Sequence, residues 1–89
     1  MNTQNTIKEL KSKSKLLKPM VWIGKNGFNE EVFKEIELQL NKKELVKIKL
    51  VKSFMEGKNK KEVAEDIALK TGAQIIELVG FMLTIYKKS

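Results

Sequence analysis

The stretch KPMVWIGKNGFNEEVF, residues 18–33, specifies a strand, a turn and the start of a helix. Pro19 ends the segment before it, because the residue that precedes a proline avoids helical dihedral angles. The apolar run of residues 20–23 then predicts a short strand buried on both faces. Asn29 is a favourable N-cap, and the two glutamates after it suit the positive end of a helix dipole. Residues 24–27, Gly-Lys-Asn-Gly, must therefore connect a strand to a helix.

This Gly-x-x-Gly connection has two interpretations. Asn-Gly is a common turn signal, so the segment can be a tight turn and nothing more. Alternatively, Gly24 and Gly27 leave room for a ligand backbone, and the helix start offers unpaired N–H groups and a partial positive charge to a phosphate. Lys25 would add a cation, and Asn26 tolerates left-handed dihedral angles. On these residues alone the turn is the favoured interpretation.

The rest of the chain predicts an α/β fold of the two-layer α+β kind. The elements alternate as helix, strand, helix, strand, helix, strand, strand, and short right-handed connections make the first two strands parallel neighbours. We therefore expect a four-stranded mixed sheet packed with three helices. The expected elements are a basic helix 5–17, a helix 29–42, a strand 45–52, a loop 52–59, a helix from the Asn59 cap to Gly72, and hairpin strands 74–79 and 82–86.

Composition limits the function. The 89 residues, 42% hydrophobic, predict a single domain, 1–89, with residues 1–6 disordered. The chain has no Cys and no His, which removes disulfides, the commonest metal ligands and the commonest general base. The four glutamates of residues 30–37 suit a solvated helix face, so we expect no enzyme, metal or cofactor. The longest apolar run, residues 78–86, is too short to span a membrane. We expect a cytoplasmic monomer.

The net charge is +7, the pI is near 9.7, and all 18 cations are lysines. They are clustered: residues 1–27 carry six Lys against one Glu, and residues 42–61 carry eight Lys against two Glu. Residues 29–41 between them carry four Glu and one Lys. Segregated positive charge favours a polyanionic partner, nucleic acid first, over a generally lysine-rich surface. Lysine alone favours phosphate contacts over bidentate contacts to guanine.

Three segments together resemble the CRM (chloroplast RNA splicing and ribosome maturation) domain, in particular its small single-domain bacterial YhbY-like form. They read LKSKSKLLKPMVWIGKNGFNEEVFKEIELQL, ELVKIKLV and KKEVAEDIALKTGAQIIELVGFMLTIYK. The most specific features are LKP followed by a strand and GKNG, the ELVKIK strand, and TGA leading into the last hairpin. The resemblance spans about residues 7–87, and it depends on the order and spacing of these features rather than on any one of them.

The resemblance implies a fold similar to the C-terminal domain of translation initiation factor three. It also implies RNA binding and a role in assembly of the large ribosomal subunit, with ribosomal RNA as partner and ribosomal proteins as further partners. KH domains grip RNA backbone with the same kind of loop. The positions carried over are the loop Gly24, Lys25, Asn26 and Gly27, the basic residues Lys11, Lys15 and Lys18, and the strand residues Lys47 and Lys49.

Some residues depart from the family pattern and leave alternatives open. Phe54, Met55, Phe81 and Met82 stand where charged or polar residues are usual. Their presence allows a second function, a protein-interaction adaptor with an exposed apolar patch. Trp22 can stack on an unpaired base, but core packing is the favoured interpretation on so short an apolar strand. The lysines of strand 45–52 can be a solvated face or an extension of the basic surface.

Overall fold

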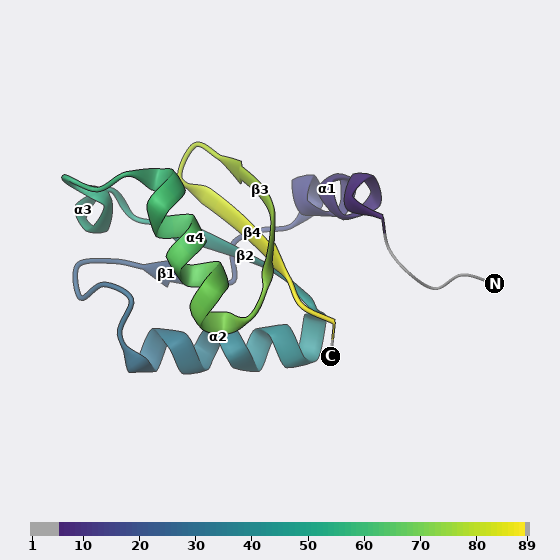
Figure 1. Ribbon diagram of the computed structural model, residues 1–89, viewed down its shortest axis with the longest axis horizontal. Helices are drawn as coiled ribbons and strands as arrows, with labels where there is room; N and C mark the ends of the chain where they lie inside the picture. The colour runs from purple at the N-terminus through teal and green to yellow at the C-terminus, as the bar shows by residue number, and fades with distance from the viewer. Residues whose placement is uncertain (1–5, 89) are drawn as a thin grey trace.

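The computed structural model describes residues 6–88, which form four helices and one four-stranded sheet (Figure 1). The sheet order is β1-β2-β4-β3, with β1 parallel to β2 and the other pairs antiparallel. The predicted α+β class and mixed sheet are confirmed. The elements are α1 (Ile7–Leu16), β1 (Val21–Ile23), α2 (Glu30–Lys43), β2 (Leu45–Leu50), α3 (Lys52–Met55), α4 (Lys60–Thr71), β3 (Gln74–Val79) and β4 (Met82–Tyr86).

One face of the sheet carries the main core. The β2 residues Val46, Ile48 and Leu50 are fully buried, as the alternation of the strand predicts. They share one apolar cluster with residues of α2 and α4, so these two helices cover the same face. The other members from the helices and from β1 and β4 are Val21, Ile23, Ile36, Leu40, Ala64, Ile67, Leu83 and Ile85.

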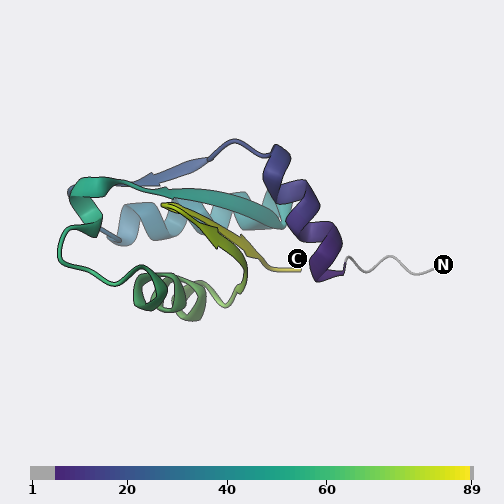
Figure 2. The ribbon, with the colours of Figure 1, turned by 90° about the horizontal axis from the view of Figure 1, so that it is seen from above.

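Helix α1 packs on the opposite face and covers only one end of it. Leu10 joins Leu45 and Ile76 in a second, smaller cluster, with Leu17 and Tyr86 beside it. Figure 2 shows α1 at one end of the sheet, away from α4. The sheet and the helices α2 and α4 therefore form the two predicted layers. Helix α1 adds a partial third layer on the other face of the sheet. The remainder of this second face has no helix over it among the described residues.

Helix α1 begins at Ile7, two residues later than the start of the predicted helix 5–17. Thr6 is its N-cap: the Thr6 side chain accepts from the Glu9 N–H and the Glu9 carboxylate accepts from the Thr6 N–H, both at 3.1 Å. This reciprocal arrangement is a capping box, which fixes a helix start by satisfying two otherwise unpaired donors. The disorder predicted for residues 1–6 lies outside the described residues except at Thr6, which is ordered as this N-cap.

The predicted loop 52–59 contains a further helical turn, α3. The Val51 carbonyl accepts hydrogen bonds from the N–H groups of Phe54 and Met55, at 2.9 and 3.1 Å. The two side chains are 8% and 5% exposed. The gain from burying two large apolar side chains, about 1.5–3 kcal/mol each, offsets the cost of ordering a short segment that lacks a side-chain cap. The loop prediction was wrong for residues 52–55.

Candidate nucleic-acid interface

The Gly-x-x-Gly segment forms a closed turn between β1 and α2. The Gly27 N–H donates to the Gly24 carbonyl at 2.8 Å, and Gly27 adopts φ +76°, a left-handed conformation that favours glycine. The Asn29 side chain then accepts from the Val32 N–H at 2.9 Å and caps α2, as predicted. The chain thus turns and enters the helix without a flexible gap.

The central residues of this turn face solvent. Lys25 and Asn26 are exposed, and no acceptor among residues 6–88 is bonded to either backbone N–H. Two further N–H groups at the start of α2 have no partner within the helix, as at any helix start. Glu30 in this first turn is ion-paired with Lys34 at 3.9 Å, which offsets part of its negative charge. The turn therefore offers donors and a cation to an anion.

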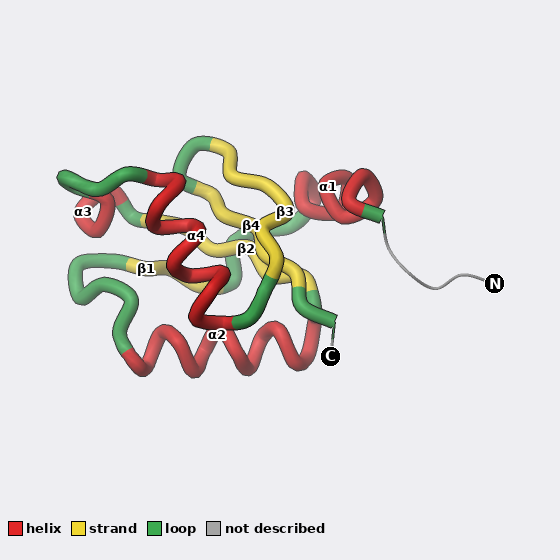
Figure 3. Tube along the Cα trace, in the orientation of Figure 1, coloured by secondary structure: helices red, strands yellow, loops and turns green. Residues whose placement is uncertain are grey.

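An aromatic ring supports the turn from the protein side. A Cβ placed on Gly27 would lie 3.7 Å from Cε1 of Phe54, so the Phe54 ring packs directly beneath this residue. The Lys58 ammonium lies 5.1 Å from the centroid of the same ring. Figure 3 shows α3 at the same end of the molecule as the turn. Sequence reasoning missed Lys58 as a cation near the loop, because its neighbourhood depends on the burial of Phe54.

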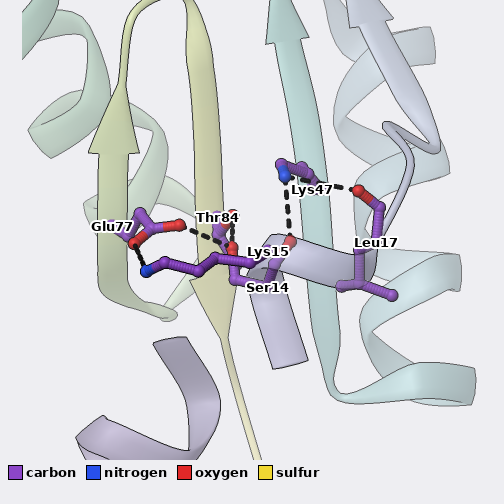
Figure 4. Close-up of polar contacts among 6 residues, drawn as sticks. All are labelled: Ser14, Lys15, Leu17, Lys47, Glu77 and Thr84. Carbon is purple, nitrogen blue, oxygen red and sulfur yellow. Dashed lines mark hydrogen bonds and ion pairs between the residues drawn. The ribbon is translucent and has the colours of Figure 1, made fainter. Parts of the chain in front are cut away.

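The C-terminal end of α1 is fixed to the sheet by a polar network (Figure 4). The buried Ser14 hydroxyl donates to Glu77 Oε2 at 3.0 Å and lies 2.7 Å from Thr84 Oγ1. Lys15 is ion-paired with Glu77 at 3.7 Å. Lys47 donates to the carbonyls of Ser14 and Leu17, at 2.9 and 3.3 Å. Cations suit the negative end of a helix dipole, so Lys47 acts as a cap for α1.

The candidate lysines consequently fall into two groups. Lys47 is half-buried and holds the end of α1, and Lys15 is ion-paired with Glu77 although its side chain is 70% exposed, whereas Lys11 and Lys18 are exposed and Lys49 is half-buried. The loop and α1 lie at opposite ends of β1 in Figure 1. The nine candidate residues therefore do not form one cluster. They lie along a strip that runs from the turn, across the face of the sheet that α1 leaves open, to the end of α1.

Trp22 is not in the core, and its predicted burial was wrong. The three residues of β1 alternate, so Val21 and Ile23 are buried and Trp22 points to the opposite face with 56% of its surface exposed. A side chain on this face is buried only where another element packs over it. Helix α1 packs over Leu45 at the other end of the sheet, so it does not cover Trp22. Trp22 pairs in register with Lys49 on β2, which places a lysine beside the indole.

The apolar patch of the adaptor interpretation does not form as predicted. Phe54 and Met55 are buried in the core, while Phe81 is 39% exposed at the β3–β4 turn. The Lys60 ammonium lies 5.7 Å from the centroid of the Phe81 ring. The four residues therefore do not share a surface, and two of them are unavailable to a partner in the folded protein. Met82 is half-buried on the open face of the sheet.

Metal binding and membrane insertion are two other functions on which the described residues bear. Residues 6–88 contain no group of three or more carboxylate, His or Cys side chains arranged to hold a metal ion. Within the same residues, no helix combines the length and the apolar character needed to cross a membrane.

The fold and the turn define a class of protein: a small α+β domain in which a lysine-bearing Gly-x-x-Gly turn leads into a capped helix. The family model of the CRS1/YhbY (CRM) domain matches residues 3–87, so the chain belongs to this family. The family resemblance inferred from the sequence is thus confirmed over almost the whole chain.

Several relatives are similar over most of this chain. It is 36% identical over 78 residues to a probable RNA-binding protein of Methanocaldococcus jannaschii, covering 88% of this chain and 58% of that protein. It is 32% identical over 80 residues to a probable RNA-binding protein of Bacillus subtilis, covering 90% and 81%. The solution structure of a candidate RNA-binding protein of Staphylococcus aureus matches with TM-score 0.76 and 31% identity, over 93% and 84% of the two chains.

Proposed function

We propose that this protein binds ribosomal RNA in precursors of the large ribosomal subunit and assists the assembly of that subunit, without catalysis, in the cytoplasm. The observation that carries the proposal is the turn at residues 24–27. It presents the Lys25 side chain and unbonded backbone N–H groups to solvent at the start of α2. Membership of the CRM family and the names of the RNA-binding relatives support RNA as the polyanion.

The chemistry of the turn suits a phosphate group more than a base. Charge-assisted hydrogen bonds from backbone N–H groups and from a lysine are stronger than neutral ones, and a phosphate oxygen accepts several of them. Gly24 has no atom within 4 Å of the position where its Cβ would stand, so a phosphodiester can approach the backbone closely there. Such contacts carry no sequence information, so specificity must come from RNA shape or from contacts elsewhere on the strip.

The test is the double variant Lys25→Asp with Asn26→Asp. Two carboxylates at the turn repel a phosphate but touch no buried residue, so we expect wild-type circular dichroism and a loss of RNA affinity. The matched control is Asn41→Asp with Lys42→Asp, which makes the same two substitutions at exposed positions near the other end of α2. That end lies about 20 Å from the turn along the helix. Filter binding to a ribosomal RNA fragment would compare the two.

Equal affinities for the two double variants would contradict the role of the turn, because they change the net charge by the same amount. The assembly role is tested separately in cell extract, by sedimentation of the protein on a sucrose gradient followed by crosslinking to RNA. We expect co-migration with a large-subunit precursor and crosslinks to its RNA. A protein found only in the soluble fraction, with no RNA crosslinks, would contradict the assembly role.

A further inference from the structure

The open part of the second sheet face carries a row of four residues, one from each strand. Trp22 of β1 pairs with Lys49 of β2, Lys49 pairs with Met82 of β4, and Met82 pairs with Val79 of β3. Residues directly opposite one another in neighbouring strands point to the same face. We call these four residues the open-face row. Three of its members are apolar, and a lysine lies between them.

This row is uncovered among the described residues. Trp22 is 56% exposed and Val79 is 62% exposed, whereas Lys49 and Met82 are half-buried between them. Helix α1 packs further along the same face, over Leu45. Large apolar side chains on a sheet face are ordinarily buried against another layer, so an exposed row that contains the single tryptophan of the chain indicates a binding surface.

The composition of the row and its position favour a nucleotide as the partner. Trp22 precedes Gly24 by two residues, so the indole lies within about 7 Å of chain length of the phosphate-binding turn. The indole offers a π-face to a base, and Lys49 beside it offers a cation to the adjoining phosphate. On the other side of β1, Trp22 also lines a hollow with Glu31 and Glu35. Those carboxylates disfavour phosphate there and direct the RNA backbone to the side of Lys49.

We propose that an unpaired base of the bound RNA stacks on Trp22, with its phosphate at Lys49 on the neighbouring strand. The proposal rests on the RNA binding proposed above and adds to it a second contact of different chemistry. The turn binds backbone through charge, whereas the open-face row binds the apolar face of a base. Single-stranded RNA would therefore occupy both, and a continuous duplex, whose bases are stacked inside the helix, would occupy only the turn.

The single tryptophan makes the contact directly measurable. We would titrate the protein with a single-stranded oligoadenylate of about 12 nucleotides, a length within the range of single-strand binding grooves, and record tryptophan emission. We expect quenching that saturates at the same RNA concentration as filter binding. We expect Trp22→Ala to weaken binding about 5- to 150-fold, the fold-change that corresponds to about 1–3 kcal/mol of stacking, while Trp22→Phe retains most of the affinity.

The dependence of affinity on salt distinguishes the contribution of Trp22 from that of Lys49. Loss of stacking leaves the number of phosphate contacts unchanged, so Trp22→Ala should keep the wild-type slope of log K against log salt. Lys49→Met should weaken binding and reduce that slope by about 0.7. The matched control is Leu69→Ala, which truncates an apolar side chain that is 81% exposed on α4, the helix that covers the opposite face of the sheet. Its affinity should equal that of the wild type.

Failure of this inference is distinguishable from failure of the proposed function. If RNA binds through the turn but leaves tryptophan emission unchanged, and Trp22→Ala binds as tightly as the wild type, then the row does not contact RNA. That result would overturn the inference and would favour a protein as the partner of the open-face row. If the oligonucleotide and the ribosomal RNA fragment both fail to bind the wild type, both proposals are wrong.

Discussion

Substitution by alanine should change the stability of the protein in opposite directions at the two glycines of the turn. Gly27 has φ +76°, and holding an alanine in the left-handed region costs about 1–2 kcal/mol. The added Cβ would stand 3.7 Å from Phe54, an ordinary van der Waals contact, so the cost comes from the backbone alone. A smaller unfolded-state gain of about 0.4–1 kcal/mol opposes it. We therefore expect Gly27→Ala to lower the free energy of unfolding by about 1 kcal/mol.

Gly24 lacks this backbone constraint. Its φ is not positive, and nothing lies within 4 Å of the position of an added Cβ. Gly24→Ala should therefore keep only the unfolded-state gain and raise stability by about 0.4–1 kcal/mol. A change of 1 kcal/mol shifts the melting temperature of a domain of this size by about 4–8 °C, so the two variants should melt on opposite sides of the wild type.

For RNA binding, we expect the substitution at Gly24 to do more harm than the substitution at Gly27. A methyl group at Gly24 occupies space through which a phosphate would approach, and losing one charge-assisted hydrogen bond of about 1.5 kcal/mol lowers affinity about tenfold. The assays are thermal melting by circular dichroism and filter binding to RNA at fixed salt. Equal melting temperatures for the two variants would refute the backbone argument. A Gly24→Ala variant that binds RNA as tightly as the wild type would refute the close approach of a ligand at this position.

Two further predictions concern the contacts that hold α1. Lys47→Met removes the ammonium that bonds the Ser14 and Leu17 carbonyls, so it should lower the free energy of unfolding in urea by about 1–2 kcal/mol. Lys49→Met loses no such bond and should change the free energy of unfolding by less than about 0.5 kcal/mol. Equal losses for the two variants would contradict the capping role of Lys47. Ser14→Ala leaves Glu77 without its buried donor and should lower the free energy of unfolding by about 1–3 kcal/mol. Ser12→Ala, at an exposed position on the same helix, should leave the free energy of unfolding unchanged. A Ser14→Ala variant as stable as the wild type would contradict the network.

The features that sequence predicted correctly are those set by local chemistry. Asn29 and Asn59 cap their helices because a short side-chain oxygen reaches backbone N–H groups two or three residues on. Gly72 ends α4 with φ +70° because a glycine adopts this conformation without strain. The alternation of β2 likewise placed Val46 and its partners in the core. Each of these outcomes depends on residues close together in the sequence, so no knowledge of the tertiary arrangement was needed.

The features that sequence missed depend on contacts between distant segments. The burial of Phe54 requires a turn formed some 27 residues earlier in the chain, and the partners of Lys47 are carbonyls at the end of α1. The sequence favours core packing for Trp22 because the four residues of the run 20–23 are all apolar and display no alternation. Trp22 is exposed because α1 covers only the other end of this face of the sheet. Hydrophobicity alone cannot distinguish a residue facing a helix from one facing solvent on the same strand.

The division of the lysines also limits how strongly RNA binding can depend on salt. The net charge of +7 and the 18 lysines would suggest many phosphate contacts. Along the strip, however, Lys15 and Lys47 are engaged within the protein, which leaves Lys11, Lys18, Lys25, Lys49 and, beside the turn, Lys58. Five contacts to single-stranded RNA give a slope of log K against log salt near about −3.5.

A slope of this size can be tested without any variant. Filter binding of the wild type to single-stranded RNA over a range of potassium chloride concentrations gives it directly. A slope steeper than about −6 would require more phosphate contacts than the strip contains, and would extend the interface to the lysines of α4 and the end of α2. Affinity that persists at high salt would come from contacts without charge. Trp22, which faces solvent beside the turn, is the side chain whose stacking would supply it.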